Sequence, residues 1–256
     1  MNWPPQPPHF LGLGAQKAGT TSLHYWLAQH PQVFLPDRKE LHYFSLHYQR
    51  GLNWYRQQYA TAGLGQRCGD ITPYYLFHPA APQRICEAMP QARLIVLLRD
   101  PVDRALSGLF HAIRLGGEPL EPLKALEAEA RRLEGAEEAL LAGAASHRAH
   151  QLQSYLSRSR YELQLARYRQ FFPAEQMLIL RSEELFAPDT AAPLLRRILV
   201  FLELSMPLLP LQLPRVNAGR GEVHLVSPEL RQWLRERLQP TYLALERDYQ
   251  LRWEHD

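Results

Sequence analysis

The residue that most constrains the chemistry of this chain is Lys17, which lies inside a short glycine-containing loop. Residues 10–22, FLGLGAQKAGTTS, contain an apolar strand at 10–13, a loop with Gly14 and Gly19, and three hydroxyl residues that open a helix. This order predicts an anion cradle, because backbone N–H groups and the positive end of the helix dipole converge on one point. The lysine adds a full positive charge there. The loop therefore predicts a binding site for a phosphate-like group.

The position of the lysine distinguishes this loop from the phosphate loop of kinases. A loop of the form G-x-x-x-x-G-K-[ST] has its lysine directly after the second glycine, with a hydroxyl next to it for Mg²⁺. Gly14 and Gly19 have that spacing, but Thr20 occupies the lysine position and Lys17 lies between the glycines. Compared with the kinase loop, this loop keeps the anion cradle but changes the residues that would bind Mg²⁺ and the γ-phosphate. This indicates a nucleotide whose transferred group is not a γ-phosphate.

Four segments together resemble one known family. QKAGTTSL resembles the 5′-phosphosulfate loop of sulfotransferases that use 3′-phosphoadenosine 5′-phosphosulfate (PAPS), and LIVLLRDPVDRALS resembles their 3′-phosphate element. KELHYF resembles the catalytic segment of the heparan sulfate branch, and TPYYLFHP a motif of its bacterial members. The match covers roughly residues 10–110 and continues more weakly through 161–185. The chain is thus identified, by resemblance, as a bacterial PAPS-dependent sulfotransferase similar to the heparan sulfate and carbohydrate branch.

The resemblance implies roles for several residues of the cradle. Lys17 would stabilise the bridging oxygen and the departing 5′-phosphate, whereas Arg99 and Ser107 would bind the 3′-phosphate. Arg220, in the segment NAGRG, is a candidate for a loop over the 3′-phosphate, although an ordinary turn explains that segment equally well. A solvated loop lysine, a structural ion pair of the arginine and plain helix capping by the hydroxyls are the alternatives. The expected donors to the 5′-phosphate are Ala18, Gly19, Thr20, Thr21 and Ser22.

Glu40 and His42 are the candidates for acid–base chemistry. They are two residues apart, so in an extended segment both side chains point to one face, with Lys39 and Leu41 on the other. In the heparan sulfate branch that this segment resembles, the glutamate is the general base, which implies that role for Glu40. His42 would then orient the acceptor or share the proton. Ordinary surface residues in a polar loop are the alternative.

The acceptor side of the expected site is less well specified. Ser45 stands where the related glycan enzymes have an acid, and Ile71 stands where they have a lysine. Both differences argue against a heparan-like acceptor more than they argue against the transfer reaction. Asp70 is a candidate contact for a lysine or the acceptor, and the rings at 74–78 either line the acceptor cleft or pack in the core.

Composition and length favour a single α/β domain over residues 1–256, with a proline-rich lead-in at 1–8. The net charge is only +3 with scattered basic residues, which argues against nucleic-acid binding. Only three of 29 basic residues are lysines, and two of these, Lys17 and Lys39, fall in the expected site. The two cysteines lack metal-site spacing. With no signal-peptide pattern and no long apolar run, a cytoplasmic location is expected.

The pattern of elements predicts a P-loop-like three-layer sandwich with a central parallel sheet flanked by helices. The unbroken apolar run of residues 91–99 predicts a buried strand, followed by a helix with Asp100 as N-cap and Pro101 in the first turn. Residues 118–150 read as amphipathic helix, either a lid or a solvated face. Further expected elements are helices at 20–29, within 45–69 over the site, at 160–171, at 190–202 and from 227, and a strand at 177–180.

The expected reaction follows from the resemblance. The chain would move the sulfuryl group of PAPS to a hydroxyl, in preference to an amine, of a carbohydrate, lipid or small-molecule acceptor, releasing adenosine 3′,5′-bisphosphate (PAP). No metal is expected to take part. Two alternatives remain, a nucleotide kinase or other phosphotransferase on the same scaffold and a nucleotide-binding module without catalysis. The sequence names neither the acceptor nor the oligomeric state.

Overall fold

The computed structural model describes residues 8–207, 212–213, 223 and 226–253, and the described strands form one parallel sheet. The strand order is β2-β3-β1-β4-β5. This confirms the predicted central parallel sheet. The strands are β1 (Phe10–Gly14), β2 (Val33–Phe34), β3 (Arg67–Ile71), β4 (Arg93–Leu98) and β5 (Met177–Arg181).

The centre of the sheet is formed by β1 and β4, which pair with each other. Residues 94–98 of β4 are at most 1% exposed, as expected for a parallel strand covered on both faces. Phe10 of β1 lies beside Gly69 of β3, where a Cβ atom would come within 2.1 Å of the Phe10 ring. The missing side chain at Gly69 therefore lets the ring lie across the neighbouring strand.

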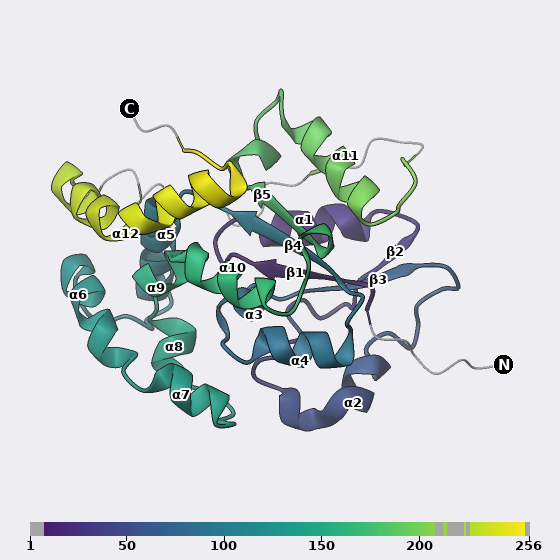
Figure 1. The fold of residues 1–256 in the computed structure, drawn as a ribbon, viewed down its shortest axis with the longest axis horizontal. Helices are drawn as coiled ribbons and strands as arrows, with labels where there is room; N and C mark the ends of the chain where they lie inside the picture. Colours follow the sequence, from purple (N-terminus) through teal and green to yellow (C-terminus); the bar gives the residue numbers. More distant parts are fainter. Residues whose placement is uncertain (1–7, 208–211, 214–222, 224–225, 254–256) are drawn as a thin grey trace.

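Helices cover both faces of the sheet, which gives the three layers (Figure 1). On one face lie α1 (Thr20–Ala28) and α11 (Ala191–Phe201). On the other lie α3 (Tyr74–Phe77), α4 (Ala81–Ala88) and α10 (Tyr161–Arg169). After β1 the chain forms β2 and β3 on one side of that strand. It then crosses to the other side, where it forms β4 and β5. Ligands of such sheets bind at the carboxyl ends of the strands, where the order reverses.

The helix α5 (Pro101–Arg114) starts at the carboxyl end of β4 and packs against α12 (Pro228–Tyr249). The predicted N-cap is confirmed, since the Asp103 N–H donates a hydrogen bond of 2.8 Å to Asp100 Oδ1 and Pro101 is the first helical residue. Leu234 and Leu238 of α12 are fully buried in a second apolar cluster against α5. This cluster fixes α5 across the edge of the sheet where β4 ends.

The segment 118–150, expected as one or two helices, contains α6 (Pro122–Arg132), α7 (Ala136–Leu141) and the start of α8 (Arg148–Leu152). The short α9 (Leu156–Ser159) connects it to α10. Among the described residues no helix is both long and apolar enough to cross a membrane. The remaining elements are α2 (Gly51–Gln57), η1 (Tyr48–Arg50), η2 (Ala174–Gln176) and η3 (Glu183–Leu185).

Candidate active site

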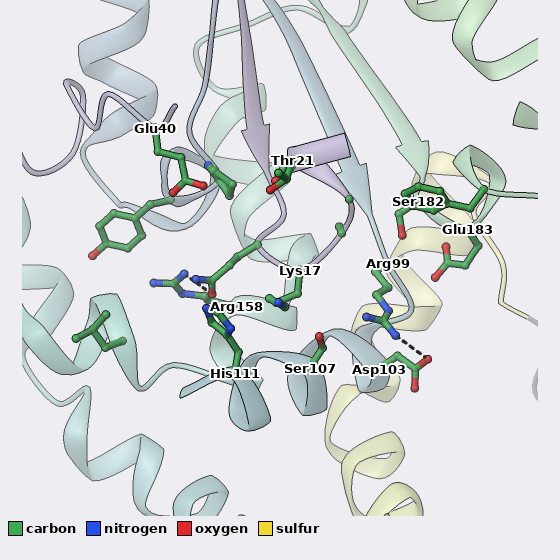
Figure 2. A pocket seen from close by; sticks show the side chains of 18 of the residues that line it. Lys17, Thr21, Glu40, Arg99, Asp103, Ser107, His111, Arg158, Ser182 and Glu183 are labelled. Carbon is green, nitrogen blue, oxygen red and sulfur yellow. Dashed lines mark hydrogen bonds and ion pairs between the residues drawn. The ribbon is translucent and has the colours of Figure 1, made fainter. Parts of the chain in front are cut away.

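A cavity of about 770 Å³ opens at the carboxyl ends of β1, β4 and β5 (Figure 2). Its volume falls within the ~300–1,000 Å³ typical of ligand sites. The loop after β1, the helix α5 and the segment around α8 and α9 form its walls. Its lining consists of Gln16, Lys17, Ala18, Gly19, Thr20, Thr21, Glu40, His42, Pro73, Tyr74, Arg99, Asp103, Ser107, His111, Gln151, Leu152, Arg158, Ser182, Glu183, Phe186 and Ala187.

The loop between β1 and α1 brings the predicted cradle to one end of this cavity. Lys17 and Gly19 have left-handed backbones, with φ of 71° and 86°, and Gly19 is the N-cap of α1. No side chain caps this helix end, so its first N–H groups are not used by a local cap. A loop that turns back twice before a helix N-terminus forms the kind of concave backbone that binds anions. The residues present therefore fit a phosphate group.

The three hydroxyl residues after the loop do not all face the cavity. Thr20 and Thr21 line it, whereas Ser22 is fully buried and is not part of the lining. Each helical residue is rotated by about 100°, so Ser22 points away from the side on which Thr20 lies. The contact of Ser22 with the 5′-phosphate stays a prediction, whereas Gly19 and the two threonines line the cavity.

Arg99, directly after β4, and Ser107 of α5 line the same cavity, and their contact with a 3′-phosphate stays a prediction. Arg99 Nη2 lies 3.4 Å from Asp103 Oδ2, and Arg231 of α12 holds the other oxygen of that carboxylate at 3.0 Å. The Arg99 pair is long and partly exposed, and such pairs contribute little to stability. An anion entering the cavity can compete for this guanidinium. The predicted contact of Arg220 lies outside the described residues.

Glu40 and His42 line the same cavity, but the backbone that brings them there was predicted wrongly. Both residues have left-handed φ, 61° and 55°, so the segment turns instead of running extended. The His42 Nε2 and Glu40 Oε2 atoms are 3.6 Å apart, longer than a hydrogen bond but close enough for electrostatic attraction. Leu41 is fully buried, whereas Lys39 bonds Glu40 Oε1 at 2.5 Å instead of lying on the opposite face.

This arrangement sets the ionisation of Glu40. Burial opposes the charged form, but the His42 ring and the Lys39 ammonium outweigh it and lower the pKa of Glu40 to about 2. The carboxylate is therefore ionised at every physiological pH and can accept a proton. Held so firmly by a cation, it is a weak base until Lys39 moves away from it.

Replacing Lys39 with glutamine is expected to raise the pKa of Glu40 by about 1 to 3, because the neighbouring charge that favours the carboxylate is removed. A carboxylate whose pKa rises is protonated at a higher pH, so activity that needs it is lost earlier as the pH falls. Carboxyl-carbon NMR titration from pH 2 to 7 measures the pKa directly. Arg38→Gln, which removes an exposed charge one residue earlier, should leave it unchanged. An unaltered Glu40 pKa in Lys39→Gln would contradict the assigned electrostatics.

Arg158 of α9 lines the cavity, and the sequence pattern did not indicate it. It is only 4% exposed, and its Nη1 donates a hydrogen bond of 2.9 Å to Gln16 Oε1, next to Lys17 in the loop. Its guanidinium lies over the rings of Tyr74 and Phe77, 4.9 and 5.1 Å from their centroids. An arginine between two serines in SRSRY gives no local sign of a buried position. The contact to Gln16, 142 residues away, would have been needed to find it.

Tyr74 of α3 and Leu152 of α8 also line the cavity. The candidate Asp70 is instead buried in the core, where Tyr55, Tyr75 and Thr72 donate hydrogen bonds to its carboxylate. Its predicted contact with a lysine or the acceptor is therefore wrong. The helix α2 was expected to lie over the site. Its Tyr55 is instead fully buried and donates a hydrogen bond to Asp70 in the core.

The described residues contain no group of three or more histidine, cysteine or acidic side chains arranged to hold a metal ion. His111, on the cavity wall of α5, has its pKa lowered by burial and then by the charges of Lys17 and Arg114. It is therefore neutral at physiological pH and adds a hydrogen-bonding ring to the wall. The cationic groups of the cavity are lysine and arginine side chains.

The model of the sulfotransferase domain family matches residues 7–212 of this chain. Among solved structures, the fold is similar to a sulfotransferase from Alicyclobacillus acidocaldarius, with a TM-score of 0.75, 27% identity and coverage of 94% of both chains. This likeness spans the whole arrangement described above, including the sheet and the helices around the cavity.

Two curated relatives match a shorter part of the chain. The membrane-associated sulfotransferase kil1 of Dictyostelium discoideum is 38% identical over 110 residues, which is 42% of this chain and 23% of that protein. The human heparan sulfate glucosamine 3-O-sulfotransferase 6 is 40% identical over 100 residues, 39% of this chain and 29% of that protein. The matched region thus spans about a quarter of the length of these relatives.

Proposed function

The chain belongs to the sulfotransferase domain family, and from this premise we propose that it transfers the sulfuryl group of PAPS to a hydroxyl group. The observation that carries the proposal is the meeting of two groups of residues in one cavity. The anion cradle with Lys17 lies at one side, and the Glu40–His42 pair lies at another. One group suits a departing phosphate and the other suits the proton of an acceptor.

We assign the donor nucleotide to the wall formed by the loop, α1 and α5. The loop N–H groups, Thr20 and Thr21 surround the 5′-phosphate, and Lys17 neutralises the charge that builds on the bridging oxygen as it leaves. Arg99 and Ser107 bind the 3′-phosphate, for which Arg99 exchanges its long contact with Asp103. A lysine inside the loop serves a phosphate that stays with the nucleotide.

Glu40 acts as the general base in this proposal. Once the acceptor hydroxyl displaces Lys39 from the carboxylate, the proton of the hydroxyl passes to Glu40 while the oxygen bonds to sulfur. His42, whose Nε2 lies 3.6 Å from Glu40 Oε2, orients the carboxylate and helps to stabilise its negative charge. The left-handed turn at residues 40–42 presents both side chains to the cavity from one short segment.

The acceptor class that best suits the cavity is a hydroxyl of a glycan. The curated relatives include proteins named heparan sulfate glucosamine 3-O-sulfotransferases, which match about two fifths of this chain. Tyr74 and Leu152 offer one ring and one aliphatic side chain at the acceptor side. Such surfaces pack against the apolar face of a sugar, and Glu40 lies beside them to accept a proton.

The test is a pair of measurements on the full chain. Calorimetric titration with PAP should show binding, and ³⁵S-labelled PAPS should transfer label to members of a glycan and small-molecule hydroxyl panel, equally with and without a chelator of divalent ions. Transfer of phosphate from ATP that disappears with the chelator would show a kinase instead. PAP binding without transfer to any acceptor, in a protein with Glu40 intact, would show a nucleotide-binding module.

A further inference from the structure

We propose that Arg158 binds the sulfuryl group while it passes from donor to acceptor, through the N–H of Nη1 that faces the cavity. This inference rests on the proposed function and adds a catalytic residue to it. The ligand is an oxygen of the sulfuryl group, a weakly basic anionic acceptor of the kind that a guanidinium recognises.

The first support is that Arg158 is held in one position. Nε donates to Ser154 Oγ at 2.8 Å, Nη1 donates to Gln16 Oε1 at 2.9 Å, and Nη2 donates to the carbonyl oxygens of His150 and Gln151. Tyr74 and Phe77 stack on the guanidinium. A side chain fixed by this many contacts is preorganised and loses little freedom when it binds a ligand.

The second support is the charge of its surroundings. Every hydrogen-bond acceptor of Arg158 among the described residues is a neutral oxygen, and no carboxylate in that part of the chain forms an ion pair with it. A buried cation is costly unless an anion is near it. Burial lowers the pKa of Arg158 to about 10, so the side chain still carries its charge at neutral pH. Glu40 and Glu129 act on this charge without an ion pair, and an anionic ligand would supply a direct partner.

The third support is the place of the one remaining donor. A guanidinium has five N–H groups, and the four bonds above use four, which leaves one on Nη1 beside Gln16. Glu40 is near enough to act on the charge of Arg158, and Gln16 precedes Lys17 in the loop. Figure 2 shows Arg158 reaching into the part of the cavity that Glu40 and Lys17 border. Arg158, Lys17 and Glu40 thus line one cavity, and we place the sulfuryl group between them.

The chemistry balances with this contact. The bond between sulfur and the bridging oxygen breaks, and its electron pair stays on PAP, where Lys17 neutralises it. The acceptor oxygen forms the new bond to sulfur, and its proton passes to Glu40. The three other sulfur oxygens share one negative charge in the donor and again in the product, and Arg158 binds one of them without giving up a proton.

The experiment compares PAPS with PAP, which lacks the sulfuryl group, in wild type, Arg158→Gln and Arg158→Lys. We expect Arg158→Gln to weaken PAPS binding at least ~10-fold relative to PAP binding, and to slow transfer by ~10²–10³-fold. Arg158→Lys keeps the charge but loses the fork, so it should fold and show a smaller loss of the same kind. Arg160→Gln, exposed two residues away, is the matched control and should behave as wild type.

An unchanged preference for PAPS over PAP in both variants would overturn the inference. A raised KM for an anionic acceptor with unchanged kcat would also overturn it, because the anion would then belong to the acceptor. If wild type binds neither nucleotide, the proposed function fails with it. If wild type binds PAP and transfers sulfuryl, only the Arg158 result decides. Thermal unfolding of each variant separates these effects from loss of the fold.

Discussion

Replacing Glu40 with glutamine is expected to slow sulfuryl transfer by ~10²–10⁴-fold, the usual contribution of a general base, while PAP binding changes little. The amide has nearly the shape of the carboxylate but accepts no proton. It also removes a negative charge, but at the acceptor side of the cavity, away from the cradle that holds the nucleotide. The variant therefore separates turnover from donor binding.

The measurement is the initial rate of ³⁵S transfer to the best acceptor of the panel, together with calorimetric titration of PAP. The matched control is Glu127→Gln, an exposed glutamate on α6 that lies outside the cavity, and it should retain wild-type rates. Intact turnover in Glu40→Gln would move the base to His42, which shares the cavity. In that case His42→Asn, and not Glu40→Gln, would abolish transfer.

The fold and the cradle could be predicted from the sequence because both are encoded locally. The apolar runs of β1 and β4 and the cap at Asp100 each occupy one short stretch of chain, and the structure has them where the pattern placed them. The order strand, glycine loop and helix leaves the backbone few other paths, so the loop around Lys17 could also be anticipated. Ser22, which was expected among the phosphate contacts, does not line the cavity.

The environment of Glu40 could not be predicted in the same way. An extended backbone was the natural reading of KELHYF, since nothing in it is a glycine, yet Glu40 and His42 both adopt left-handed φ. That turn brings the Lys39 ammonium into contact with the Glu40 carboxylate. An alternating pattern would have placed Lys39 on the opposite face. The position of Asp70 in the core was equally unpredictable from local sequence, because the tyrosine hydroxyls that donate hydrogen bonds to it come from two separate helices.

Arg158 shows where local patterns end altogether. Its contacts combine α8, α9, the α3 aromatic rings and the loop after β1, and no period in the sequence relates these segments. Only the folded chain brings the guanidinium beside Gln16. The sequence could therefore propose candidates for the cradle and the base, whereas Arg158 emerges as a candidate only from packing.

Removing the ammonium of the loop with Lys17→Ala is expected to weaken both steps of the reaction. The affinity for PAP should fall by ~10–100-fold, because a charged contact to the 5′-phosphate is lost. The transfer rate should fall by a further ~10²–10³-fold, because charge on the leaving oxygen is no longer neutralised. Glu40→Gln is expected to change only the second quantity, so the two variants assign the two sides of the cavity.

The chain offers a close control, since Lys124 of α6 is exposed and is one of only three lysines. Lys124→Ala should leave PAP affinity and rate at wild-type values. Lys17→Arg keeps a charge but spreads it over a planar fork, and we expect it to restore PAP binding more than turnover, since the loop presents a compact ammonium to one oxygen. A Lys17→Ala protein that still binds PAP and transfers sulfuryl normally would contradict the assignment of the leaving phosphate to the loop, and with it the reason why a lysine between the two glycines indicates sulfuryl transfer.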